Sequence, residues 1–160
     1  MPRPLEFIAR HRGGLLEAAD HRALMAWSLT CVRHVLPYWS TNPPVMIETA
    51  LHVGSEWSMG EVPAGDAINM ARQIHRLART LDDPVQVALM RAAGQAVSTA
   101  HMADHSLGGA LYSLKAVKLS GLEPSDELAW QLGHLPSLPA QLAMVLETYY
   151  ASKRPAYLRC

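Results

Sequence analysis

The sequence predicts an all-α protein, a single-domain helical bundle of about six or seven helices around a long central helix that spans roughly residues 84–121. Three observations favour this fold class. No segment alternates apolar and polar residues as a half-buried strand does. Alanine, leucine and methionine, which favour helix, are abundant. Proline and glycine residues divide the chain into segments of helical length.

The length and composition predict one domain. The chain has 160 residues, of which 49% are hydrophobic, enough to form one packed core without disulfides or a structural metal. We expect an N-terminal segment at residues 1–14, a helical core at 20–121 and a helical extension at 122–160.

The first predicted helix follows Gly13-Gly14, which ends a short amphipathic segment. Asp20 is a good N-cap residue for this helix, and Pro37 ends or kinks it. His34 lies in its last turn, where an imidazole can bond the free helix-terminal carbonyls.

The middle of the chain repeats the pattern of a capping residue followed by proline. Asn42-Pro43-Pro44 opens a helix that Gly60 ends, and a second helix follows over residues 66–78. Asp83-Pro84 caps the next element, which contains no proline before Pro124. This long interval predicts the central helix, with Gly121 as its C-terminal stop.

The C-terminal part predicts two more helices. Ser125 caps a short one, and the last runs from about Pro139 to Tyr149, followed by an irregular tail over residues 152–160. Tyrosines are frequent in interfaces, so Tyr149, Tyr150 and Tyr157 also make a homodimer surface an option.

Charge and motifs exclude several classes of partner. Fourteen basic residues balance fourteen acidic ones, and neither sign forms a block, so we expect no nucleic acid partner. No run approaches the ~20 apolar residues that cross a bilayer, and no secretory signal is visible, so we expect a cytoplasmic protein with no membrane partner. No phosphate loop or dinucleotide fingerprint is present, and no cofactor is expected.

The candidate site is a polar stripe on the predicted central helix. At ~100° per residue, His101, His105, Gly108, Tyr112 and Lys115 share one face. Most of the remaining surface of this helix is apolar, which predicts that the stripe is partly buried and needs polar partners. The partner candidates, which are also candidate ligand- or partner-binding residues, are Glu48, His52, Glu56, Arg72, His75 and Asp104.

Three interpretations of the stripe remain open. The first is a hydrogen-bonded structural network. The second is an acid–base site, with His101 or His105 as general acid or base, Tyr112 as proton donor and Lys115 stabilising negative charge. The third is a metal site, because His101 and His105 have i, i+4 spacing, but Met102 stands where the zinc-protease motif requires glutamate. Gly94 and Gly108 on this face allow either close packing or space for a ligand.

Two blocks of sequence resemble a known family. The first is Trp27-Ser-Leu-Thr-Cys31-Val-Arg-His34-Val35-Leu36-Pro37. The second contains Ala-Gly-x-Ala-Val-x-Thr-Ala-His, ending at His101, followed by Tyr112 and Lys115. Over about residues 20–120, the chain resembles the bacterial putative immunity protein family, small α-helical proteins related to polymorphic-toxin immunity domains. The resemblance implies a protein that neutralises a partner toxin by binding it. The alternative from the residues alone is a small-molecule enzyme or ligand-binding bundle.

Overall fold

The computed structural model describes residues 2–159, and within that range it is a bundle of seven α-helices without a β-strand. This confirms the predicted all-α bundle. The helices are α1 (Ala18–Val35), α2 (Val45–Ser58), α3 (Ala64–Ala78), α4 (Pro84–Ser98), α5 (His105–Leu119), α6 (Pro124–Gly133) and α7 (Ala140–Tyr157). Three short 3₁₀ helices accompany them: η1 (Leu5–Phe7), η2 (Arg10–Arg12) and η3 (Leu36–Tyr38).

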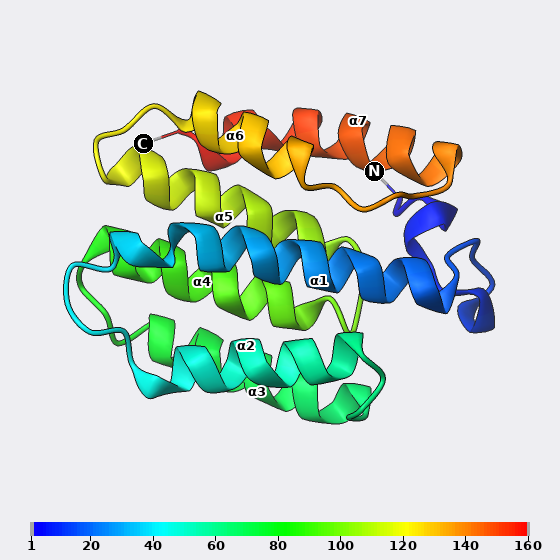
Figure 1. Ribbon diagram of the computed structural model, residues 1–160, viewed down its shortest axis with the longest axis horizontal. Helices are drawn as coiled ribbons and strands as arrows, with labels where there is room; N and C mark the ends of the chain where they lie inside the picture. Colours follow the sequence, from blue (N-terminus) through cyan, green and yellow to red (C-terminus); the bar gives the residue numbers. More distant parts are fainter. Residues whose placement is uncertain (1, 160) are drawn as a thin grey trace.

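The helices lie roughly parallel or antiparallel in stacked rows (Figure 1). In this view, α2 and α3 form the lower row, α1 and α4 the middle, and α5, α6 and α7 the upper part. The N-terminal segment with η1 and η2 folds over one end of the bundle, beside the start of α1. This segment is tied back on itself by backbone bonds, including Arg10 N–H to the Leu16 carbonyl at 3.2 Å.

The predicted long helix over residues 84–121 is wrong as one continuous element. The helix ends at Ser98 and restarts at His105, and α4 and α5 form the most extensive helix pair of the bundle. The break occurs at neither Gly94 nor Gly108. The backbone N–H groups of Thr99 and His101 donate hydrogen bonds to the carbonyls three residues earlier. The Nε2–H of His21 donates to the Thr99 carbonyl. The apolar surface of residues 84–121, which predicted a helix at the centre of the bundle, is buried because α4 and α5 pack on each other.

Several predicted helix ends are confirmed by their caps. The Asp83 carboxylate accepts hydrogen bonds from the N–H groups of Val85 at 2.8 Å and Gln86 at 3.2 Å, so it caps α4 as expected. Gly60 and Gly121 follow α2 and α5 with φ of 78° and 81°. Residues other than glycine rarely adopt that left-handed conformation, which explains why both helices end there.

Three predicted boundaries are wrong. The first helix begins at Ala18, with Glu17 rather than Asp20 at the N-cap position. The short helix α6 begins at Pro124, with Glu123 rather than Ser125 at the N-cap position. The tail was expected to be irregular from residue 152, but α7 continues to Tyr157 with Pro155 inside it. Proline removes one backbone donor without preventing the last turn, because it lies near the helix end.

The buried side chains form two clusters that share α1 and α5. One cluster fills the space among α1, α2, α3, α4 and the last turns of α5, and includes Leu29, Leu51 and Ile74. The other joins the N-terminal segment, α1, α5 and α7, and includes Trp27, Leu111 and Tyr150. Because both clusters draw on α1 and α5, these two helices connect the two halves of the bundle.

Candidate functional site

The break between α4 and α5 divides the predicted polar stripe. His101 lies exposed in the turn, and His105 is the first residue of α5. Tyr112 and Lys115 are half-buried further along α5, and the Tyr112 ring packs edge-on against Tyr157 with centroids 5.0 Å apart. Tyr112 is two helical turns, or ~10 Å, beyond His105. Only His101 leaves the predicted face, because it lies in the turn, while His105, Tyr112 and Lys115 keep the spacing of one face of α5. His101 and His105 therefore lack the helical i, i+4 geometry on which the metal interpretation depended.

His75 and His105 do come together, in a polar cluster between α3, α4 and α5. The His75 ring accepts a hydrogen bond at Nδ1 from Arg91 at 3.1 Å, and the His105 Nδ1–H donates to the Gln95 amide oxygen at 2.7 Å. Burial, with the nearby charges of Arg91 and His105, lowers the pKa of His75 to about 4. Burial also lowers the pKa of His105, partly offset by Asp104. Both rings are therefore neutral near pH 7.

Glycine residues make this cluster compact. A Cβ added to Gly94 would lie 2.5 Å from the His75 ring, and one added to Gly108 would lie 2.5 Å from the Gln95 side-chain oxygen. The space beside the two glycines is thus filled by polar side chains of the protein itself.

The other predicted partner residues are on the surface. Glu48, His52 and Arg72 are exposed on α2 and α3, and the only contact among these predicted residues is the 3.5 Å pair of His52 with half-buried Glu56. Asp104 forms a 3.1 Å ion pair with Arg3, while its other carboxylate oxygen is buried without a partner among residues 2–159. None of these five residues reaches the His75 cluster through a hydrogen bond or ion pair within the described chain.

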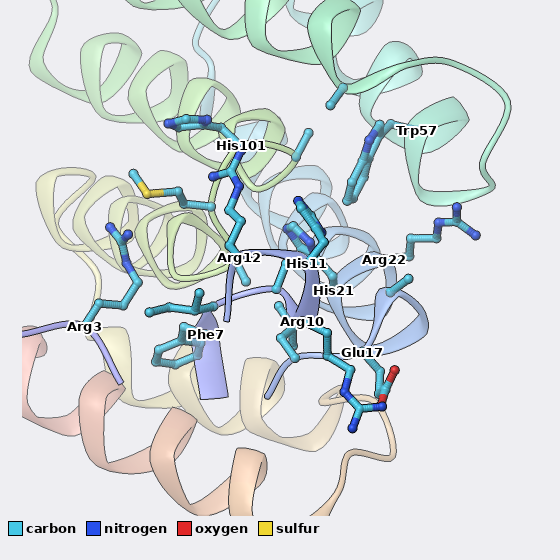
Figure 2. Close-up of a pocket in the computed structure, with 18 residues that line it drawn as sticks. Arg3, Phe7, Arg10, His11, Arg12, Glu17, His21, Arg22, Trp57 and His101 are labelled. Carbon is cyan, nitrogen blue, oxygen red and sulfur yellow. The ribbon is translucent and has the colours of Figure 1, made fainter. Parts of the chain in front are cut away.

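Sequence reasoning missed a basic pocket at the end of the bundle near the N-terminus (Figure 2). This pocket has a volume of about 510 Å³ and lies between the N-terminal segment, the start of α1, the end of α2 and the turn after α4. Its basic lining residues are Arg3, Arg10, His11, Arg12, His21, Arg22 and His101, and its only acidic lining residue is Glu17.

Two of the four pocket arginines are neutralised by carboxylates. Arg10 pairs with Glu17 at 2.7 Å and Arg3 pairs with Asp104 at 3.1 Å. Within residues 2–159, Arg12 and Arg22 have no ion pair. Burial, with the charges of Arg12, His11 and Arg22, lowers the pKa of His21. The His21 Nε2–H donates to the Thr99 carbonyl, and its ring stands edge-on to Trp57 at 5.0 Å.

The sequence did carry a weak signal for this pocket. The run Arg10-His11-Arg12 and the pair His21-Arg22 are the densest basic segments in the first part of the chain. Arg10-His11-Arg12 forms the 3₁₀ helix η2, which is too short for a periodic pattern, and His21-Arg22 lies on a different element, α1. No pattern within one helix therefore predicts that the two segments meet.

A second missed group joins α1 to α6 and α7. The prediction that His34 bonds the carbonyls at its own helix end is wrong. Its Nδ1–H donates to the buried Glu127 carboxylate at 2.6 Å. Its ring also stacks on Trp130 at 3.6 Å. Glu127 further accepts from the Gln131 amide at 3.0 Å, and Gln131 accepts from the buried Tyr150 hydroxyl. A shallow pocket of about 360 Å³ borders this network and includes Tyr38.

Residues 2–159 contain neither a metal-ion cluster nor a membrane-spanning helix. No group of three or more histidine, cysteine, aspartate and glutamate side chains is arranged to hold a metal ion. No helix in this range combines the length and apolar character that a membrane span requires.

The protein is an all-α bundle, and its seven described helices enclose two hydrophobic clusters that both include residues of α1 and α5. The chain belongs to the family described as Imm-5 like putative immunity protein, whose model matches residues 14–138. This confirms the family resemblance found in the sequence. Comparison with curated proteins and with solved structures gave no significant match.

Proposed function

We propose that this protein is an immunity protein that binds a partner toxin and neutralises it. The observation that carries the proposal is the family match, which extends over residues 14–138 and therefore over most of the bundle. A tightly packed helical bundle suits such a role, because a preformed surface pays little conformational cost on binding.

The distribution of the predicted catalytic residues supports binding over acid–base catalysis. A general acid and base must reach one substrate, within about 3 Å of the atoms that exchange protons. His101 is exposed in a turn, His105 is bonded to Gln95, and Tyr112 packs on Tyr157. An enzyme that uses His101, His105, Tyr112 and Lys115 together therefore has less support.

For the toxin-facing surface we propose the α6 patch, which we define as Tyr38, Leu122, Glu123, Asp126 and Trp130. Tyr38 and Leu122 are 38% and 49% exposed, and Glu123 and Asp126 are exposed carboxylates beside them. Trp130 lies between the rings of His34 and His134, at 3.6 and 3.9 Å, which holds it in one orientation. Fixed aromatic groups with acidic neighbours suit a partner surface that carries arginine or lysine.

A second candidate face consists of Glu48, His52, Glu56 and Arg72 on α2 and α3. Its members come from the sequence predictions, and all four lie on or near the surface. It offers no exposed aromatic side chain among these four residues, which is why we favour the α6 patch.

The test begins with a search for a toxin gene among the genes that neighbour the gene of this chain. Expression of that toxin in a bacterial host should stop growth, and co-expression of this protein should restore it. The purified pair should form a complex in calorimetry. A wild-type protein that neither restores growth nor binds would overturn the proposed function for that toxin.

Variants then locate the surface. The double variant Tyr38→Ala/Asp126→Arg should weaken binding at least tenfold, because it removes an aromatic contact and reverses one charge. Val45→Ala is the matched control, since Val45 is 81% exposed on α2, away from the patch. If the double variant binds as tightly as this control, the α6 patch is wrong while toxin binding stands.

A further inference from the structure

The N-terminal basic pocket is a concave surface with an apolar floor. The buried side chains of Phe7 and Leu16 line it together with Met102 from the turn after α4, and Trp57 stands at its edge (Figure 2). Its volume of about 510 Å³ is large enough to receive an apolar side chain from a binding partner. Such anchoring side chains, buried in a pocket of the other protein, supply much of the binding energy of many interfaces.

Positive charge surrounds this floor but does not converge on one point. Within residues 2–159, Arg12 and Arg22 are the two pocket arginines without an ion pair. Figure 2 shows Arg12 in the middle of the pocket and Arg22 at its far side, beyond His21. The Arg22 guanidinium lies against Gly60, where an added Cβ would be 3.4 Å from it. A small anion bound by Arg12 therefore leaves the charge of Arg22 unbalanced.

Charge complementarity then selects an acidic polypeptide segment as the occupant. An extended chain advances ~3.3 Å per residue, so carboxylates a few residues apart can reach guanidinium groups at separate points. Each carboxylate can accept two parallel hydrogen bonds from one guanidinium group. The pocket itself offers little competition, because Glu17 is its only acidic lining residue and is already paired with Arg10 at 2.7 Å.

We propose that this pocket docks an acidic segment of another protein, in which carboxylates flank an apolar side chain. Arg12 and Arg22 bind different carboxylates, and the apolar side chain lies against Trp57 and the floor. The pocket adjoins the start of α1 and the α6 patch follows its end, so the length of this 18-residue helix, ~27 Å, separates them. The inference therefore does not depend on toxin binding at the α6 patch.

The test is a titration of the isotope-labelled full chain with the acetylated peptide amide Glu-Glu-Phe-Glu-Glu, followed by nuclear magnetic resonance. The indole N–H signal of Trp57 should shift and saturate, while that of Trp27, which is buried elsewhere, should not. The same peptide with glutamine in place of glutamate should bind at least tenfold more weakly, because it keeps the phenylalanine but loses the charges. No saturable shift with the acidic peptide, or equal affinity of the two peptides, would overturn the proposal.

Single variants show whether the two arginines act at separate points. Arg12→Gln and Arg22→Gln should each weaken binding of the acidic peptide about threefold, and the double variant should lose the product of both factors. Both side chains are exposed, so the fold should remain. Arg72→Gln/Arg76→Gln is the matched control, because it removes the same charge from the exposed face of α3. A double pocket variant that binds the peptide as tightly as this control contradicts the proposed site.

Two further measurements test the choice of occupant. Tighter binding of phenyl phosphate than of the acidic peptide would show that the pocket selects a small anion instead. A particle size in gel filtration that rises with protein concentration, and does so only while Arg12 and Arg22 are present, would identify the acidic α6 patch of a second copy as the occupant. Weak binding of phenyl phosphate and a constant particle size support the proposal.

Discussion

At the scale of single residues, the most perturbed histidine of the bundle is His75. Its ring is packed on Gly94 and accepts a hydrogen bond from the positively charged Arg91. It faces further positive charge from Arg79 at the end of α3, and from His105 on α5 once that ring is protonated. A second proton on the imidazole ring of His75 would add positive charge to a half-buried site that is already positive. The native protein therefore resists protonation of this ring at pH values where an unfolded chain accepts it.

This difference predicts an acid-dependent loss of stability. The folded pKa of about 4 lies below the unfolded value of 6.5, so as the pH falls the unfolded state binds the proton first. The stabilisation is fully present above pH 6.5 and is lost as the pH falls toward 4. Between pH 7 and 5 we expect the free energy of unfolding to fall by roughly 1 kcal/mol through His75, allowing for solvent screening.

Urea unfolding of the wild type and of His75→Gln at both pH values measures this contribution. Glutamine can still accept the Arg91 hydrogen bond but does not titrate, so the variant should lose less stability than the wild type on acidification. His21 titrates in both proteins and cancels in the comparison, whereas the coupling between His105 and His75 is removed together with the His75 ring. An equal loss in the two proteins would show that the His75 ring is protonated as readily in the native state as in the unfolded chain.

At the scale of elements, the close contact of α5 with α1 and α4 depends on Gly109. A Cβ at this position would lie 2.1 Å from the Ser28 hydroxyl of α1, and 3.3 Å from the Cα of Ala96 on α4. A backbone atom cannot move aside as a flexible side chain can. The glycine thus sets how closely the three helices approach.

We therefore expect Gly109→Ala to destabilise the protein by ~1–2 kcal/mol, because the cost of overpacking exceeds the gain in helix propensity. Gly65→Ala is the control, since an added Cβ at residue 65 on α3 meets nothing within 4 Å. The control should show no loss in thermal or urea unfolding. Equal stability of the two variants would mean that α1 and α4 can move apart at little cost.

The elements also show what the sequence could and could not predict. Local signals placed the start of α4 correctly, because Asp83-Pro84 acts through neighbouring backbone groups. The break at residues 99–104 has no proline, and the His21 ring that bonds the Thr99 carbonyl within it is 78 residues away in the sequence. Likewise, His34 bonds Glu127, 93 residues further on, instead of a carbonyl at its own helix end. Candidate sites that depend on such distant pairs, including the basic pocket, cannot be located by periodicity within one helix.

At the scale of the whole molecule, the helical bundle extends beyond the residues that the family model matches. The match stops at residue 138, before α7 begins at Ala140. Leu142, Leu146 and Tyr150 of α7 are nevertheless at most 5% exposed and lie in the cluster that contains Trp27 and Leu111. The C-terminal helix is therefore part of the folded unit of this chain.

A chain shortened to residues 1–138 should accordingly fail to form a stable monomer. Burial of three large side chains is worth roughly 5–8 kcal/mol in total, which is comparable to the entire stability of a typical domain. We expect aggregation in gel filtration and loss of cooperative urea unfolding. A chain that ends at residue 157 keeps all of α7 and is the control. Cooperative unfolding of the 1–138 chain at the midpoint of this control would contradict the prediction.

The turn at residues 99–104 also bears on how the chain reaches this structure. It joins the two helices that form the most extensive pair of the bundle through only six residues. Closing so short a loop costs little chain entropy, and contacts between sequence neighbours form faster than contacts between distant segments. We therefore expect the α4–α5 hairpin to form early in folding, before segments that are distant in the sequence pack onto it.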